Sequence, residues 1–300
     1  RDRLRSRGLG DVYKRQVITG GGSGHEPAFV GYLGDGMLDS VAIGEVFASP
    51  PALAFYDAIV DADQGEGVAV LFGNYAGDNM NVKMAVQMAE DDDIEVKYVV
   101  ANDDVASAPK AVKEQRHGIA GGFFMWKVGG ARAAKGGSLD DVIASAQNVV
   151  NRTKSICVGL EPCVIPALGH SNFKIEDGTM EFGVGHHGEA GTKVEKLKSA
   201  SEMAQEMAET ILNDFDFEEG KEVAVMLSGL GATPVMELYV LYDEVEKVLA
   251  KAGHKVWKTY IGNYVTSLDM NGASLTIVDL DDEIKELLSE PAVPIGMKNY

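Results

Sequence analysis

The feature that most constrains the fold is a regular alternation of strand-like and helix-like segments that begins at Val17. Short apolar runs, such as residues 17–19 and 67–72, are typical of buried strands, and longer periodic stretches such as 80–90 are typical of helices. Alternation of this kind is typical of an α/β fold with a largely parallel sheet. The same patterns predict strands over residues 41–46, 95–100, 222–227, 255–260 and 275–278, and helices over 52–60, 138–152, 201–214, 233–252 and 282–289.

The first predicted strand runs into a glycine-rich stretch, GGGSGHEP, at residues 20–27. Without a Cβ, glycine lets the backbone turn sharply and approach a small ligand, and the exposed amides can surround oxygen-rich groups. His25 would stand at the carboxyl end of a strand, where open α/β sheets bind ligands. The alternative is an ordinary glycine-rich turn with an incidental surface histidine. The spacing matches neither the dinucleotide pattern G-x-G-x-x-G nor the phosphate-binding loop G-x-x-x-x-G-K-[ST].

Polar side chains also follow the next two predicted strands. Asn74 and Asp78 come after the strand at 67–72, and Asp103 and Asp104 come after the strand at 95–100. Because the carboxyl ends of parallel strands meet at one edge of a sheet, we expect these side chains to gather there with His25.

Local patterns predict three details of the helices. Met80, Met84 and Met88 share one helical face, which predicts a stripe of side chains in the core. Ser201 is the expected N-cap of the helix that runs to residue 214, and Thr233 is the expected N-cap of the next one.

The composition excludes several classes of protein. The formal net charge is −19, whereas phosphate binding needs clusters of Lys and Arg, so we expect no nucleic acid as a partner. No apolar run approaches the roughly 18 residues of a membrane span, so we expect no membrane partner. The two cysteines, Cys157 and Cys163, provide neither a disulfide framework nor a zinc quartet. The composition therefore indicates a cytoplasmic protein.

Two boundaries are expected along the chain. Residues 1–16 are basic, lack an initiator Met and have no signal-peptide core, and they are interpreted as a non-native addition, with a native basic arm as the alternative. A change of character near residues 153–166 predicts a division into two α/β domains, 17–158 and 159–300.

A second glycine-rich loop, GVGHHGEAG, lies at residues 183–191. One interpretation is metal binding, but the adjacent His186 and His187 point in different directions and no third ligand stands at a fixed spacing, so no metal site is predicted. The other interpretation is a nucleophilic or general-base histidine with Glu189 nearby.

With both loops in view, the chain resembles the dihydroxyacetone kinase family, specifically its substrate-binding K subunit. The resemblance rests on seven segments in the family's order: GGGSGHEP (20–27), GEVFASP (44–50), NYAGDNMN (74–81), DDVA (103–106), RHGIAGG (116–122), GHHGEAG (185–191) and YVTSLDMNGASLT (264–276). It implies a two-domain α/β subunit, usually a homodimer. In such a subunit the substrate is held between the glycine-rich loop of the first domain and a histidine of the second.

The resemblance also implies roles for individual residues. His187 is similar to the family's histidine that attacks a ketone carbonyl and forms a hemiaminal. His25 resembles the general base for the terminal hydroxyl, and Asp78 resembles a second acid–base or hydroxyl-orienting residue. The remaining substrate-binding positions would be Gly22, Ser23 and Gly24.

A partner and a reaction follow from the same resemblance. The K subunit binds dihydroxyacetone or a similar short ketose and holds no cofactor itself, while a separate L-type subunit carries ATP or ADP with Mg²⁺. The chain would be a phosphotransferase of the glycerone kinase type that acts with this partner, whether the donor is ATP or a phosphoenolpyruvate-driven relay. Gly73 replaces a lysine of the family's best-known members, which leaves room for a larger ketose such as erythrulose.

Two other functions remain as alternatives. A non-catalytic paralogue that senses the ketone and signals to a transcription regulator would need His187, but not His25 and Asp78 as acid–base groups. A generic small-ligand or metal-binding α/β protein would leave the seven matching segments unexplained. The presence of His25 and Asp78 favours the kinase subunit.

Overall fold

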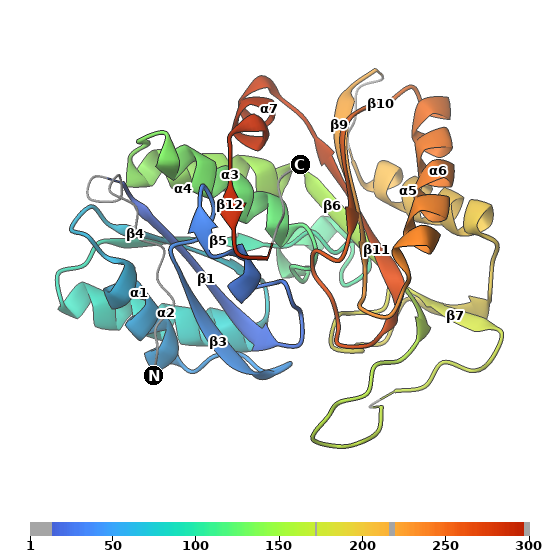
Figure 1. Ribbon diagram of the computed structural model, residues 1–300, viewed down its shortest axis with the longest axis horizontal. Helices are drawn as coiled ribbons and strands as arrows, with labels where there is room; N and C mark the ends of the chain where they lie inside the picture. The colour runs from blue at the N-terminus through green and yellow to red at the C-terminus, as the bar shows by residue number, and fades with distance from the viewer. Residues whose placement is uncertain (1–13, 172, 216–219, 297–300) are drawn as a thin grey trace. The chain divides into compact units, whose positions relative to one another are not determined.

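The computed structural model describes residues 14–171, 173–215 and 220–296, which form two compact units (Figure 1). Among the described residues, unit 1 comprises 14–101, 122–151 and 281–296, and unit 2 comprises 102–121 and the described residues of 152–280. The predicted α/β class is confirmed, because each unit combines a sheet with packed helices. The chain passes between the units several times, so a single boundary at residue 158 does not describe the division.

Unit 1 is built on a four-stranded parallel sheet in the order β3-β1-β4-β5. Helices α1 and α2 cover one face, and α3 and α4 cover the other (Figure 1). A short antiparallel ribbon pairs β2 with β12. The elements are β1 (Gln16–Ser23), β2 (Gly34–Asp35), β3 (Ser40–Val46), α1 (Ala52–Ala62), β4 (Val68–Gly73), α2 (Ala76–Asp91), β5 (Val96–Ala101), α3 (Gly122–Ala134), α4 (Leu139–Asn151), α7 (Asp282–Ser289) and β12 (Val293–Pro294).

Strand β4 shows why this sheet needs helices on both faces. Val70 and Phe72 belong to the core beneath α1 and α2. Leu71 points the other way, since its Cδ1 would lie 2.7 Å from a Cβ placed on Gly129 of α3. The Leu71 carbonyl also accepts a hydrogen bond from the indole of Trp126 on α3 at 3.1 Å. Alternate residues of a strand face opposite sides, so a continuous apolar run is buried only when both sides are covered.

Unit 2 is built on a six-stranded sheet in the order β10-β9-β11-β6-β7-β8. Only β10 and β9 are parallel, and the other neighbours pair antiparallel. The largely parallel sheet predicted from the sequence is therefore present in unit 1 but not here. The elements are β6 (Thr153–Glu161), β7 (Thr179–Phe182), β8 (Lys193–Lys196), α5 (Ala200–Asp214), β9 (Glu222–Gly229), α6 (Val235–Lys251), β10 (Lys255–Gly262) and β11 (Asn271–Asp279).

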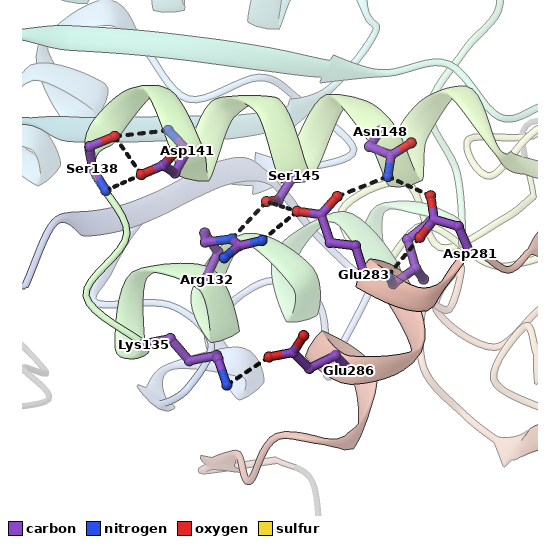
Figure 2. A network of polar contacts seen from close by, with 10 residues as sticks. Arg132, Lys135, Ser138, Asp141, Ser145, Asn148, Asp281, Glu283 and Glu286 are labelled. Carbon is purple, nitrogen blue, oxygen red and sulfur yellow. Dashed lines mark hydrogen bonds and ion pairs between the residues drawn. The ribbon is translucent and has the colours of Figure 1, made fainter.

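Helix α7 binds α3, α4 and the residue that follows α3 through a network of hydrogen bonds and ion pairs (Figure 2). The Glu283 carboxylate accepts from the Ser145 hydroxyl at 2.7 Å and pairs with Arg132. The Asn148 amide donates to Asp281 at 2.9 Å, and Lys135 pairs with Glu286 at 2.9 Å. These contacts explain why the last helix belongs to unit 1, although it directly follows β11 of unit 2.

The predicted methionine stripe is wrong. Met80 and Met84 are 61% and 53% exposed. The buried face of α2 is formed instead by Val82 and Val86 together with Asp78, Ala85 and Ala89. The small and β-branched side chains of that face fit closely against the sheet, and the long methionines lie outside it.

Both predicted helix caps are also replaced. Ser199, rather than Ser201, caps α5 through a capping box with Glu202. Pro234 stands at the N-cap of α6, because the Thr233 hydroxyl donates instead to the carbonyl of Gly272 at 2.6 Å.

The start of the chain differs in part from expectation. Residues 1–13 lie outside the described part, but Gln16 opens β1 and Lys14 pairs with Asp39 at 2.6 Å. Residues 14–16 are thus part of unit 1. Within the described ranges, no helix has the length and apolar content needed to cross a membrane.

Candidate functional site

The glycine-rich stretch of unit 1 is a strand that ends in a tight turn. Gly22 still belongs to β1, and a Cβ there would lie 2.7 Å from the backbone nitrogen of Ala48, so only glycine permits this approach. Gly24 has a φ of 100°, a region that favours glycine. Its amide donates to the Glu26 carboxylate at 3.1 Å, and the Ser23 hydroxyl donates to the Gly44 carbonyl at 2.7 Å. The turn therefore binds part of its own donors.

His25 is buried among aromatic rings. Its side chain is only 4% exposed and stacks on Phe47 with ring centroids 5.2 Å apart. Phe29 approaches the same imidazole edge-on at 6.1 Å. An incidental surface histidine is thereby excluded.

Asp78 lies on the first turn of α2, where the positive end of the helix dipole favours a carboxylate. Its Oδ1 accepts a hydrogen bond from the Ser49 hydroxyl at 3.0 Å, and Ser49 in turn accepts from the Asn81 amide at 3.2 Å. Ser49 and Phe47 belong to the same connection between β3 and α1. His25 and Asp78 are thus both held by this one loop of unit 1.

Asp103 and Asp104, which the sequence predicts beside His25, have contacts of their own in another part of the chain. Both belong to unit 2, where the Asp103 carboxylate accepts from the amides of Ile119 and Gly121 at 3.1 and 2.8 Å. Burial raises the pKa of Asp104 to about 7, and repulsion by Asp103 and Glu189 acts in the same direction. The amide contacts of Asp103 hold the 102–121 segment within unit 2.

The histidine loop of unit 2 is organised by Glu189. One carboxylate oxygen accepts from His187 Nδ1 and the other from the His187 amide, each at 2.8 Å. Burial raises the pKa of Glu189, but the His187 hydrogen bonds and charge outweigh burial and lower it to about 2. Because a carboxylate only accepts hydrogen bonds, Nδ1 of His187 must carry the proton.

The backbone before His187 is held as well. The Ser267 hydroxyl donates to the carbonyl of His186, and Ser267 is fully buried. His186 is 3% exposed, whereas His187 is half-buried. Of the two adjacent histidines, His187 is therefore the more exposed.

Comparison with known proteins now gives the family. A family model described as the Dak1 domain matches residues 7–295. The chain belongs to the Dak1-domain family. It is 42% identical over 267 residues to the PTS-dependent dihydroxyacetone kinase 1, dihydroxyacetone-binding subunit DhaK, of Listeria innocua, covering 89% of this chain and 81% of that one. The resemblance to a K subunit is confirmed.

Two further relatives of this Dak1-domain chain bear on function. The D-erythrulose kinase of Mycolicibacterium smegmatis is 38% identical over 93% of this chain and 48% of its own length. The solved structure of the dihydroxyacetone kinase operon co-activator DhaQ superposes with a TM-score of 0.90 at 31% identity, covering 95% of this chain and 88% of that one. The family fold is therefore shared by kinases and by a co-activator.

Two serines of the Dak1-domain structure were not predicted as site residues. Ser49 donates to the Asp78 carboxylate, and Ser267 donates to the carbonyl that precedes His187. Both lie in segments that carried the resemblance, but a serine in a loop gives no sign of the atom it binds. Among the described residues, no cluster of three or more His, Cys, Asp or Glu side chains is arranged to hold a metal ion.

Proposed function

We propose that this chain is the substrate-binding subunit of a dihydroxyacetone-type kinase and captures a short ketose covalently on His187. The observation that carries the proposal is the hydrogen bond from His187 Nδ1 to Glu189, which assigns the ring proton to Nδ1. Nε2, the nitrogen not engaged by Glu189, then has its lone pair available as a nucleophile. The similarity to a DhaK subunit supports the same reading.

The capture step balances without any further reagent. The Nε2 lone pair forms a bond to the carbonyl carbon, and the carbonyl π pair moves to oxygen, which takes up a proton. The ring releases its Nδ1 proton to water, so the product is a neutral hemiaminal. An alcohol such as glycerol has no carbonyl to attack, and it is rejected by chemistry rather than by size.

His25 and Asp78 are proposed as the acid–base groups that activate the terminal hydroxyl of the captured ketose. Their shared support by the Phe47–Ser49 connection favours a joint role. Gly22, Ser23 and Gly24 would line the same substrate site.

The natural ketose is proposed to be dihydroxyacetone, with erythrulose as the second candidate. Gly73 ends β4 without the lysine of the best-known family members, and an erythrulose kinase is among the relatives. Relative rates of adduct formation with the two ketoses would decide between them.

Phosphoryl transfer needs a donor that this chain does not supply in the proposed scheme. An L-type partner subunit would carry ATP or ADP with Mg²⁺ and provide the phosphoryl group, with ATP or phosphoenolpyruvate as the ultimate donor. We further propose a cytoplasmic homodimer. Kinase activity should appear only when the partner is added.

Intact-mass measurement with dihydroxyacetone tests the central step. A covalent adduct should form on the wild type and on His186→Ala, and it should be absent from His187→Ala. An adduct that maps to His186, or none on a folded wild-type sample, would overturn the proposal.

The second candidate function is a ketone-sensing co-activator, and the close superposition on DhaQ favours it. Such a protein would form the same adduct but give no turnover with any L-type subunit. The kinase assay with a partner therefore separates the two functions, because the adduct alone does not.

A further inference from the structure

We propose that Glu189 and Ser267 are positioning residues that fix His187 for nucleophilic attack, and this inference rests on the function proposed above. Neither side chain is assigned contact with the substrate. Together they hold the His187 ring and the peptide unit that precedes it. Both residues belong to unit 2, as His187 does.

The peptide between His186 and His187 is bound at both of its polar atoms. Its carbonyl accepts from the Ser267 hydroxyl, and its N–H donates to the Glu189 carboxylate at 2.8 Å. A third bond, from His187 Nδ1 to the other carboxylate oxygen, fixes the ring itself. One carboxylate therefore couples the backbone and the side chain of the same histidine.

The loop makes room for that carboxylate by having glycine at position 185. A Cβ on Gly185 would lie 2.2 Å from Glu189 Oε2. The Gly185 amide also donates to the Glu189 carbonyl at 2.9 Å, so the turn closes around Glu189. Glycine is therefore needed at position 185 because the Glu189 carboxylate occupies the space of a side chain there.

Ser267 is held firmly enough to serve as a fixed donor. Its own amide donates to the Leu230 carbonyl at 2.8 Å. Earlier in the same loop, the amides of Tyr264 and Val265 donate to the hydroxyl of Ser228 on β9 at 3.0 and 3.2 Å. The loop after β10 is therefore bound to the end of β9. Through the Ser267 hydroxyl, this loop also holds the peptide before His187.

Charge adds to the geometric effect. As Nε2 bonds to a carbonyl carbon, positive charge develops on the imidazole ring. An adjacent carboxylate stabilises that charge, and it also keeps Nδ1 as the protonated nitrogen. Loss of Glu189 should therefore slow attack as well as loosen the ring.

The first test measures the ring tautomer without any ketone. Protein labelled with ¹⁵N-histidine should show His187 protonated at Nδ1, with the signal assigned by its loss in His187→Gln. Glu189→Ala should populate both tautomers. Glu189→Gln should also perturb the site, because its single amide oxygen cannot serve both the ring and the backbone donor. Retention of a pure Nδ1–H ring in both variants would overturn the role of Glu189.

The second test measures the rate of adduct formation with dihydroxyacetone. Glu189→Gln should be slower by about ten- to hundredfold, the usual effect of losing a hydrogen bond to a charged group. Ser267→Ala should be slower by about two- to tenfold, and Ser267→Thr, which keeps the hydroxyl, should recover most of the rate.

A matched control separates positioning from general destabilisation. Thr276 on β11 is fully buried in the same unit, and its hydroxyl bonds Ser155 at 2.7 Å. Thr276→Val should lower the thermal midpoint much as Ser267→Ala does, yet leave the adduct rate unchanged. Wild-type rates in both Glu189→Gln and Ser267→Ala would refute the proposal. If the wild type forms no adduct at all, the proposed function fails, while the tautomer measurement still decides the role of Glu189.

Discussion

His25 of unit 1 and His187 of unit 2 both follow glycine-rich turns, but their surroundings differ in chemistry. His25 is packed between the rings of Phe47 and Phe29, whereas His187 is bound by a carboxylate at its Nδ1 and at its amide. Aromatic packing restricts where a ring lies and leaves its protonation open. A carboxylate contact fixes both the orientation and the tautomer.

This difference suits the two roles proposed. A general base must exchange a proton during each cycle, and aromatic packing orients a ring without assigning its proton. A nucleophile that attacks through one nitrogen gains from having its proton fixed on the other. The comparison therefore predicts that the two histidines can be separated by experiment.

The largest expected effect is on turnover with an L-type partner. His25→Gln and Asp78→Asn should each lower kcat by about 10²–10⁴-fold, the usual contribution of a general acid–base group. Both should still form the His187 adduct at near wild-type extent, as measured by intact mass.

Two outcomes would contradict separate roles for His25 and His187. If His25→Gln turned over at the wild-type rate, His25 would only shape the substrate site. If it abolished the adduct as well, the two histidines would not have separate tasks.

In unit 1 the sequence predicted the strands that precede the site residues better than the contacts those residues make. The strands that precede His25 and Asp78 were recognisable, because a buried strand needs a continuous apolar run. The mostly antiparallel sheet of unit 2 was not, since β11 and β6 pair across more than a hundred residues and leave no local pattern. The exposed Met80 shows the same limit, because helical periodicity alone does not tell which of two apolar faces meets the sheet.

The site residues divide in a similar way. His25, Asp78 and His187 could be proposed from short segments with a family resemblance. Ser267 could not, because the atom it binds lies 81 positions earlier in the chain. Asp104 looked like a member of the first site, yet its carboxylate binds the amide of Ala106 inside unit 2.

Two carboxyl groups of unit 2, Asp104 and Glu189, have pKa values that are shifted in opposite directions. The folded pKa of Asp104 is about 7, raised mainly by burial from 3.8. As pH rises between these values, the unfolded chain loses this proton while the folded chain keeps it, so stability falls. Asp104→Asn should remove that loss, so its effect on the free energy of unfolding should be more favourable at pH 8 than at pH 5, by roughly 3 kcal/mol at most.

Glu189 provides the contrast for that measurement. Its folded pKa of about 2 lies below the ordinary 4.5, so its contribution to stability is complete above pH 4.5 and is lost only as pH falls towards 2. Glu189→Gln should therefore be destabilised to a similar degree at pH 5 and at pH 8. A pH-independent effect of Asp104→Asn would show that its carboxyl is ionised throughout this range.

The smallest effect concerns the serines that support the loop of unit 1. The Ser49 hydroxyl binds the Asp78 carboxylate at 3.0 Å, whereas the Ser23 hydroxyl binds the neutral carbonyl of Gly44 at 2.7 Å. Hydrogen bonds to charged groups contribute about 1.5–3 kcal/mol and neutral ones about 0.5–1.5 kcal/mol. Ser49→Ala should thus lower kcat by roughly ten- to hundredfold, and Ser23→Ala by no more than about tenfold, with the His187 adduct unchanged in Ser49→Ala. Equal losses in the two variants would mean that Ser49 supports the loop rather than Asp78, and the acid–base site of unit 1 would then depend on packing alone.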